Sequence, residues 1–247
     1  MIDFERGAKA TGTKFYFLTG NDALRELQLC MKMIEFHAER GYEPVIPPYL
    51  VNKKTCEMAG ILPRFEGDFY ETQDGFVLIP TAETPLVGFR ANEIIPEEEL
   101  PLKYVAFSPC FRREAGAAGK KDKGLKRVHQ FHKIELFVIC KPEDSERLHE
   151  EMTAQVEELL DELGVEHRRI ELDENDRPPT SAKTYDIEVR AGEEWLEVSS
   201  ISNTLDRQAK PAQIRYRPRP QAKPVKCHIL NGSGVALPRL TLAMLGG

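Results

Sequence analysis

The sequence predicts an α+β fold in which helices flank a mostly antiparallel β-sheet. Short apolar segments typical of strands are spread over the 247-residue chain and are joined by hairpins, loops and amphipathic helices. No regular alternation of strand and helix occurs, so a parallel sheet built from βαβ units is not expected. The chain also lacks the GxGxxG and GxxxxGK(S/T) patterns, which argues against a Rossmann crevice or a P-loop.

The composition is that of an ordinary globular protein, with 41% hydrophobic and 30% charged residues. No apolar run approaches the length of a membrane span, and the first residues carry acidic side chains where a signal peptide has an apolar core. Five cysteines at irregular spacing form no CxxC pair, which favours reduced thiols. We therefore expect a cytoplasmic protein with no membrane partner.

The first long helix is predicted over residues 21–40. Asn21 or Asp22 suits its N-cap, and Gly41 suits its end. The apolar residues that recur at helical spacing are Leu24, Leu27, Met31, Ile34 and Ala38.

Four strands are expected between this helix and residue 140. YEPVIPPYLV (42–51) contains prolines that exclude a central strand, so an edge strand ending in a rigid turn is predicted. GFVLIPT (75–81) is typical of a short buried strand. LKYVAFSPCFRRE (102–114) and VHQFHKIELFVIC (128–140) are predicted to pair as antiparallel strands across a loop.

The second long helix is predicted over residues 142–163, with an apolar face formed by Leu148, Met152, Val156, Leu159 and Leu163. Three further strands follow, TYDIEVR, EWLEVSSISN and KCHILNGSG. We interpret NGSGVALPR (231–239) as a small-residue turn that leads into a final helix, VALPRLTLAML.

Charge is distributed unevenly along the chain. The net charge is −6, yet residues 110–133 hold eight Lys or Arg and only two acidic residues, and no Asp or Glu follows Asp206. A globally acidic protein is a poor nonspecific nucleic-acid binder. The local basic segments therefore indicate a smaller anionic target, such as a nucleotide, or a limited contact with RNA.

The predicted hairpin gathers groups that suit a nucleotide. Residues two apart on a strand share a face, so one face would present Arg112, Glu114, Phe131 and Glu135 together. An arginine can hold a phosphate through two hydrogen bonds, and an aromatic ring can stack on a base. A carboxylate can hold an ammonium or amino group. The alternative is a charged face that only contacts solvent.

Three other segments carry weaker signals. Thr81 and Glu83 lie two apart at the end of an apolar strand. In EWLEVSSISN, strict alternation places Glu197 with Ser199 on one face and Ser200 on the other; a carboxylate and a hydroxyl are ligands suited to Mg2+. Arg239 falls in the first turn of the last helix, where a helix N-terminus favours phosphate.

Taken together and in order, these segments resemble the signature motifs of class II aminoacyl-tRNA synthetases, specifically the seryl-tRNA synthetase family. GYEPVIPPYLV, about 41–51, is similar to motif 1, with its proline at Pro48. Residues about 104–137 are similar to motif 2 and its loop, and about 227–247 to motif 3. PTAET resembles the TxE loop, and EVSSISN resembles the serine-site strand. The resemblance implies that residues 1–247 form a single catalytic domain of that fold.

The resemblance implies a role for each matching residue in ATP binding. Arg112 would hold the α-phosphate, Glu114 the adenine amino group, and Arg127 the γ-phosphate side of a bent ATP. Phe131 would stack on adenine, and Arg239 would cover the other face of the ring and reach the phosphates. Arg112 and Arg239 would be the catalytic pair.

It also implies a serine site and a metal site. Thr81 and Glu83 would hold the serine ammonium group, with Arg112 nearby. Glu135 would bind the serine side chain, helped by Ser233, and Asn231 would line the pocket. Glu197 and Ser200 would ligate Mg2+ beside the ATP phosphates.

The activity implied is ATP-dependent activation of L-serine to seryl-adenylate, followed by transfer to tRNA(Ser) by a homodimer that associates through motif 1. The family's N-terminal coiled-coil arm is missing, and the chain ends eight residues after Arg239. We therefore expect a catalytic core, excised or designed, with reduced activity and weakened tRNA binding.

Two other functions remain open at this stage. A related armless ligase activates an amino acid for a carrier protein, although the motif regions offer no cysteine pair for the zinc site of such enzymes. A core of this kind could also bind ATP or partners with weak or no turnover.

Overall fold

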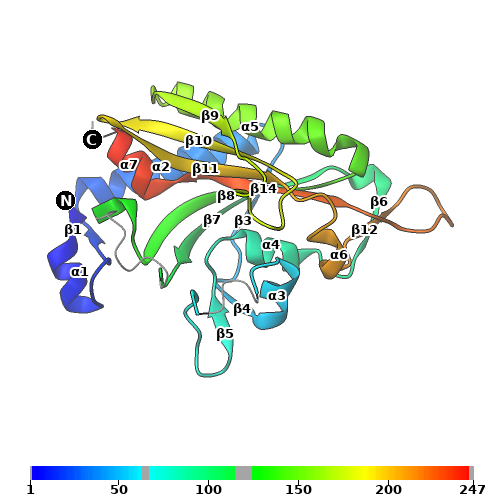
Figure 1. The fold of residues 1–247 in the computed structure, drawn as a ribbon, viewed down its shortest axis with the longest axis horizontal. Coiled ribbons are helices and arrows are strands. Elements are labelled where there is room, and N and C mark those ends of the chain that lie inside the picture. Colours follow the sequence, from blue (N-terminus) through cyan, green and yellow to red (C-terminus); the bar gives the residue numbers. More distant parts are fainter. Residues whose placement is uncertain (1, 63–66, 115–123, 245–247) are drawn as a thin grey trace.

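A computed structural model describes residues 2–62, 67–114 and 124–244. Its centre is a seven-stranded sheet in the order β3-β7-β8-β14-β11-β10-β9, in which β3 and β7 are parallel and the other neighbours antiparallel (Figure 1). Its strands are β3 (Glu43–Val45), β7 (Leu102–Phe111), β8 (Gln130–Cys140), β9 (His167–Glu171), β10 (Lys183–Ala191), β11 (Glu194–Asn203) and β14 (His228–Ala236). The α+β prediction with a mostly antiparallel sheet is confirmed, as are the edge strand and the β7–β8 pairing.

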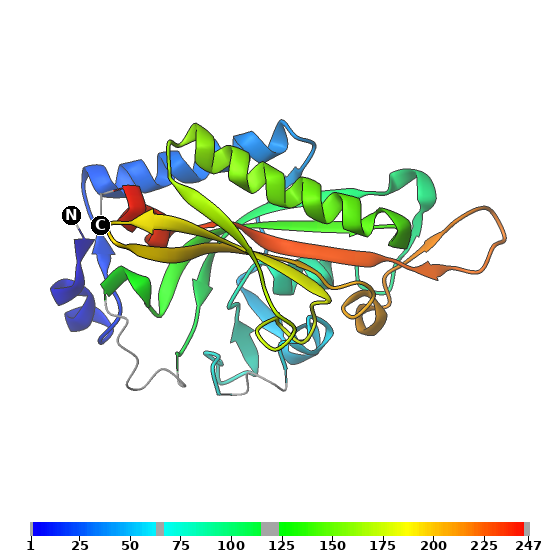
Figure 2. The same cartoon turned by 45° about the horizontal axis from the view of Figure 1, so that its top comes forward.

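Three helices cover one face of this sheet: α2 (Asn21–Ala38), α5 (Ser145–Glu162) and α7 (Leu237–Met244). Figure 2 shows α2 and α5 side by side over the strands. The predicted face of α5 is correct, because Leu148, Met152, Val156 and Leu159 are all buried there. Burying one such side chain stabilises the folded state by about 1.5–3 kcal/mol, so this helix layer contributes much of the stability of the fold.

The opposite face is covered differently. The helices α3 (Lys53–Met58), α4 (Glu83–Phe89) and α6 (Ala209–Ala212) pack at one end of it, over Phe137 and Ile139 of β8. Farther along the same face of β8, towards its start, lie Lys133 and Glu135, which are buried beside a cavity. The uncovered end of this face is therefore polar.

Shorter elements complete the described chain. They are β1 (Ile2–Asp3), α1 (Phe4–Ala10), β2 (Phe17–Leu18), β4 (Leu50–Asn52), β5 (Phe76–Leu78), β6 (Ile94–Pro96), β12 (Arg215–Arg217), β13 (Val225–Lys226) and 3-10 turns at Glu97–Glu99, Gly124–Lys126 and Pro142–Asp144. The strand predicted at 75–81 is β5, which pairs with β4 outside the main sheet. Its Val77 is buried as expected, but Phe76 is exposed.

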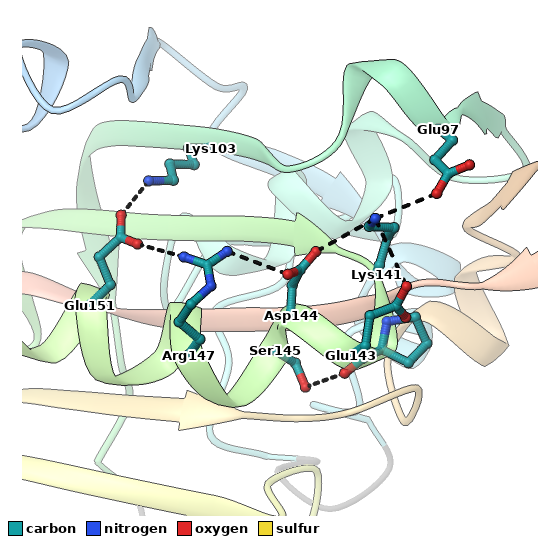
Figure 3. Close-up of polar contacts among 9 residues, drawn as sticks. Glu97, Lys103, Lys141, Glu143, Asp144, Ser145, Arg147 and Glu151 are labelled. Carbon is teal, nitrogen blue, oxygen red and sulfur yellow. Dashed lines mark hydrogen bonds and ion pairs between the residues drawn. The ribbon is translucent and has the colours of Figure 1, made fainter. Parts of the chain in front are cut away.

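A chain of ion pairs ties the start of α5 to the sheet (Figure 3). Lys103 of β7 lies 2.6 Å from Glu151, and Arg147 links Glu151 to Asp144. At the other end, Lys141 joins Asp144 to Glu97 of the 3-10 turn Glu97–Glu99. Partly exposed pairs of this kind contribute little energy individually, so the network mainly fixes the position of the helix.

The structure corrects the prediction for the helix at 21–40. The N-cap is Gly20 and has no side-chain cap, and the helix ends at Ala38 before Gly41, whose φ is 85°. The side that packs on the sheet contains Cys30, Met33 and Phe36. Of the apolar residues at helical spacing, Ile34 packs against this core, whereas Leu24, Leu27 and Met31 are 54%, 54% and 53% exposed. Helical periodicity identifies apolar stripes on a helix, but it does not indicate which stripe packs on the sheet.

The turn predicted within residues 231–239 is wrong, whereas the final helix and the position of Arg239 in its first turn are confirmed. Strand β14 continues to Ala236 and α7 begins at Leu237. The small residues serve close packing instead: a Cβ on Gly232 would lie 2.8 Å from the Ile201 side chain and 3.0 Å from the Ile201 Cα. Gly234 is an extra residue in the register with β8, between Ser233 and Val235.

We predict that Gly232→Ala destabilises the fold by about 1–3 kcal/mol, because the new methyl group collides with the backbone of β11. Urea denaturation measures the change. Gly88→Ala is the matched control, since its Cβ would meet the side chain of Thr55, whose methyl group lies nearest at 3.0 Å, and alanine favours the α4 helix. An equal or smaller loss for Gly232→Ala than for the control would contradict this packing account.

Candidate active site

The uncovered end of the sheet is hollowed by two adjoining cavities of about 420 and 100 Å3. Their walls share six residues, Arg112, Glu114, Arg127, Lys133, Glu197 and Ser233, so they form one cleft with two ends. Every site residue predicted from the sequence lines this cleft: Thr81, Glu83, Arg112, Glu114, Arg127, Phe131, Glu135, Glu197, Ser200, Asn231, Ser233 and Arg239.

The smaller end of the cleft combines cations with an aromatic ring. The guanidinium carbon of Arg112 lies 5.3 Å from the centroid of Phe131, within range of a cation–π contact. The backbone N–H of Arg112 donates to the carbonyl of His129 at 2.9 Å, which extends the β7–β8 pairing beyond Phe111. Arg112 and Phe131 therefore lie on the same face of the hairpin, as predicted.

Arg127 and Glu114 are paired in this end. Arg127 Nε donates to Glu114 Oε2 at 2.9 Å, and both side chains are less than one quarter exposed. The φ of Glu114 is 53°, a left-handed conformation that glycine adopts more readily than glutamate. The chain turns there out of the strand direction and brings the Glu114 carboxylate towards the guanidinium group.

The larger end contains a buried hydrogen-bonded cluster on β8 and the segment before α4. Thr81 Oγ1 donates to Glu135 Oε2 at 2.9 Å, and Lys133 Nζ donates to Thr81 Oγ1 at 2.8 Å. Lys133 also forms an ion pair with Glu135 at 2.5 Å, in which the two side chains are 6% and 2% exposed. This arrangement matches the general rule that buried charges are paired.

A buried glutamine connects the other predicted serine ligands. Gln208 donates from Nε2 to Glu83 Oε1 and, at 3.0 Å, to the carbonyl of Ala59. Its Oε1 accepts from Asn231 Nδ2 at 3.1 Å. Gln208 therefore holds Glu83 and Asn231 in fixed positions relative to each other.

A β-bulge decides the geometry of the predicted metal ligands. In the pairing of β10 with β11, Ile187 faces Ser199 and Glu188 faces Glu197, so Val198 is an extra residue. Val198 is buried in the core, while Glu197 and Ser200 both line the cleft. The strict alternation assumed from the sequence, which put them on opposite faces, is wrong because of this bulge.

Arg239, at the start of α7, contacts the same segment. Its Nη1 donates to the carbonyl of Glu197 at 2.7 Å and lies 3.4 Å from the Glu197 carboxylate. The helix begins within the wall of the smaller cavity, which brings Arg239 close to Phe131 and Arg127.

The pKa of Glu83 is raised from 4.5 to about 7, chiefly by burial and also by the charge of Glu135. The hydrogen bond from Gln208 and the positive charges of Lys133 and Arg112 act in the opposite direction. Glu83 therefore gains its negative charge near neutral pH, where a cationic ligand would stabilise that charge.

Lys133 and Gln208 were missed as site residues. Lys133 shares a strand face with Phe131 and Glu135, and this alternation could have identified it. Gln208 precedes a four-residue helix and has no sequence signal of its own. The lysines predicted to add positive charge at 120, 121 and 123 lie outside the described residues.

Within residues 2–62, 67–114 and 124–244, no group of three or more His, Cys, Asp or Glu side chains is arranged to hold a metal ion. No helix in these segments has the length and apolar character needed to cross a bilayer. All five cysteines are buried and unpaired.

We predict that Glu83→Gln stabilises the unliganded chain at pH 8 by on the order of 1–3 kcal/mol. The pKa of Glu83 is raised from 4.5 to about 7, so its ionisation destabilises the folded state as the pH rises through that window. Denaturation at pH 8 and pH 5 measures the effect, which should shrink at pH 5. The control is exposed Glu98→Gln. An equal gain in the free energy of unfolding at both pH values would contradict the raised pKa of Glu83.

The chain matches the family model of the tRNA synthetase class II core domain (G, H, P, S and T) over residues 64–246. A serine–tRNA ligase of Dehalococcoides mccartyi is 43% identical over 249 residues, and one of Methylacidiphilum infernorum is 46% identical over 249 residues. These alignments cover 99% of this chain and 60% and 59% of the relatives. The chain thus spans about 60% of the length of the curated relatives that it matches.

Solved structures are similar over nearly the whole chain. The crystal structure of seryl-tRNA synthetase from Pyrococcus horikoshii complexed with ATP has a TM-score of 0.96 and 42% identity, and covers 99% of this chain and 56% of that chain. The cytoplasmic serine–tRNA ligase from Naegleria fowleri in complex with AMP has a TM-score of 0.91 and 32% identity, with 98% and 58% covered. From the fold, the cleft and these matches together, the chain belongs to the family of class II tRNA synthetase core domains.

Proposed function

We propose that this chain activates L-serine with ATP, forming seryl-adenylate and releasing pyrophosphate. The observation that carries the proposal is the single cleft, in which a cationic and aromatic end adjoins an end with buried carboxylates. ATP suits the first end and the ammonium and hydroxyl groups of serine suit the second. The matches to serine–tRNA ligases support the same substrates.

The proposed chemistry needs no protein nucleophile. The serine carboxylate attacks the α-phosphorus of ATP, the bond to the β-phosphate oxygen breaks, and pyrophosphate leaves. Arg112, at the junction of the two ends, would stabilise the charge on the α-phosphate oxygens, and Arg239 and Arg127 would orient the remaining phosphates. Catalysis by positioning and charge stabilisation is typical of phosphoryl and nucleotidyl transfer.

Serine selectivity is proposed to come from buried polar groups. Glu135 would accept a hydrogen bond from the serine hydroxyl, with Ser233 beside it, while Thr81 and Glu83 would hold the ammonium group. Alanine would leave the Glu135 carboxylate without that partner, and a site built for a hydroxyl rejects an analogue that lacks one.

A magnesium ion fits the cleft at Glu197 and Ser200. The carboxylate and the hydroxyl are oxygen ligands, and the bulge at Val198 places both in the cleft wall. The phosphates and water would supply the other ligands, as is usual for Mg2+. When bound, the ion would neutralise charge on the phosphates.

Transfer of serine to tRNA(Ser) is the second part of the proposal, together with a cytoplasmic location. It rests on the named relatives, of whose length the chain spans about 60%. We also propose that residues 1–247 act as one catalytic domain, with the three motifs at about 41–51, 104–137 and 227–247.

The direct test is serine-dependent ATP–pyrophosphate exchange, with threonine, alanine and glycine assayed in parallel. The proposal predicts exchange with serine and much less with the other three. Exchange that prefers glycine or alanine would contradict it and favour an amino-acid ligase for a carrier protein. ATP binding without exchange would also contradict it and favour a nucleotide-binding core without turnover.

We predict that Arg112→Ala lowers the exchange rate at least 100-fold, because the charge that develops on the α-phosphate loses its nearest cation. Circular dichroism and thermal unfolding should match those of the parent, since Arg112 is exposed in the cleft. The matched control is Arg113→Ala, which changes an exposed neighbour outside both cavities. An exchange rate close to that of the parent would exclude the proposed role of Arg112.

A homodimer is proposed from the surface of α2 and the motif 1 segment. Leu24, Leu27 and Met31 form an exposed apolar stripe, and Ile46, just after β3, is 86% exposed. Such a concentration of exposed apolar side chains is typical of an interface. A second copy of the chain would cover it.

We predict a dimer at micromolar concentration in analytical ultracentrifugation and a monomer for the double variant Leu27→Glu with Met31→Glu, because the stripe cannot bury four charges across a twofold axis. The control is Val225→Glu, an exposed apolar residue in β13. A monomeric parent, or a double variant that stays dimeric, would contradict this interface.

A further inference from the structure

Lys133 is the feature of the cleft that the proposed reaction leaves without a role. Its side chain is 6% exposed, although lysine is rarely buried unless it is paired. Both of its partners belong to the proposed serine site: Thr81 Oγ1 at 2.8 Å and Glu135 Oε2 at 2.5 Å. A buried cation therefore lies among the groups that would hold the substrate ammonium.

We propose that Lys133 is a positioning residue that sets both the charge and the geometry of the amino-acid end, so that this end accepts one ammonium group. The inference rests on the proposed function, because it takes the ligand to be an α-amino acid. Lys133 itself would not touch the reacting atoms.

The charge argument follows from the groups that face the cavity. The wall of the larger cavity also carries Asp68, Arg112, Glu114, Arg127 and Glu197, but the hydrogen-bonded cluster around Thr81 holds two carboxylates, Glu83 and Glu135, and one ammonium group, Lys133. With all three ionised, this cluster carries a net charge of −1, which one substrate ammonium neutralises. Without the lysine, two nearby buried carboxylates would repel each other, and proton uptake by one of them would remove the site for the substrate.

The geometric argument concerns the hydroxyl of Thr81. Because this oxygen accepts from Lys133 and, at 3.2 Å, from the backbone N–H of Glu83, its own proton is directed to Glu135. The lysine thus fixes which lone pairs and protons of the cluster remain for a ligand. A cluster ordered before binding loses less free energy on binding than one that must reorganise.

The decisive variant is Lys133→Met, which keeps the length of the side chain and removes its charge. We expect KM for serine to rise at least 30-fold and KM for ATP to change less than threefold. Lys103→Met is the matched control: Lys103 is a strand lysine paired with Glu151 outside the cleft, with a side chain 15% exposed. It should leave both constants unchanged.

Two further readouts separate positioning from a packing role. In Lys133→Ala, methylammonium or ethylammonium in the buffer should restore serine-dependent exchange, since a small cation can occupy the vacated volume. As the pH falls, Lys133→Met should lose its affinity for serine at a higher pH than the parent does. This follows because Lys133 and Arg112 lower the pKa of Glu83, whereas burial and Glu135 raise it.

An unchanged KM for serine, a parallel rise of both KM values, or absence of rescue by the small amines would overturn the inference. Calorimetric binding of serine separates this failure from failure of the proposed function. A parent without exchange that still binds serine, with loss of binding in Lys133→Met, would refute adenylation and support the inference. A parent that binds no serine would refute both.

Discussion

The cleft exists because one end of one sheet face has no helix over it. The helices α2, α5 and α7 bury the other face, whereas α3, α4 and α6 cover only the far end of this one. A buried polar group without a partner costs free energy, so the side chains at the uncovered end must bond to each other or to a ligand. This constraint explains why so many charged residues of different strands meet there.

Several charged groups of the cleft satisfy one another. Arg127 pairs with Glu114, Arg239 with Glu197, and Lys133 with Glu135. Two of these pairs lie at the proposed nucleotide and metal positions and would exchange partners on binding. The Lys133–Glu135 pair is nearly inaccessible to solvent, and in our account it persists with substrate bound.

Local irregularities give the cleft its shape. The bulge at Val198 turns Glu197 to the same side as Ser200, and the extra residue Gly234 follows Ser233 directly. The left-handed Glu114 directs its carboxylate to Arg127. Each departure from a regular strand occurs beside a residue proposed to bind a ligand, where such strain is most often found.

These irregularities also mark what the sequence could and could not predict. Regular alternation correctly placed Phe131 and Glu135 on one face, and Lys133 follows the same alternation. It failed at Glu197 and Ser200, because a one-residue bulge has no signature in an apolar pattern. Helical spacing predicted α2 but left open which side meets the sheet: Leu24, Leu27 and Met31 form an exposed apolar stripe, and periodicity does not distinguish a core from an interface.

The placement of Gln208 depended on tertiary contacts alone. It lies far from Glu83 and Asn231 in sequence and bonds to both, a relation that no local pattern contains. The family resemblance supplied the ligand set, whereas the groups that support those ligands became visible only in the structure.

We propose that nucleotide and amino acid occupy the two ends of one cleft. Isothermal titration calorimetry with a non-hydrolysable seryl-adenylate analogue, compared with ATP and with serine, tests this arrangement. A single molecule that fills both ends should bind at least 100-fold more tightly than either substrate, since joining two ligands makes the second contact intramolecular. An analogue that binds no more tightly than ATP would contradict the account.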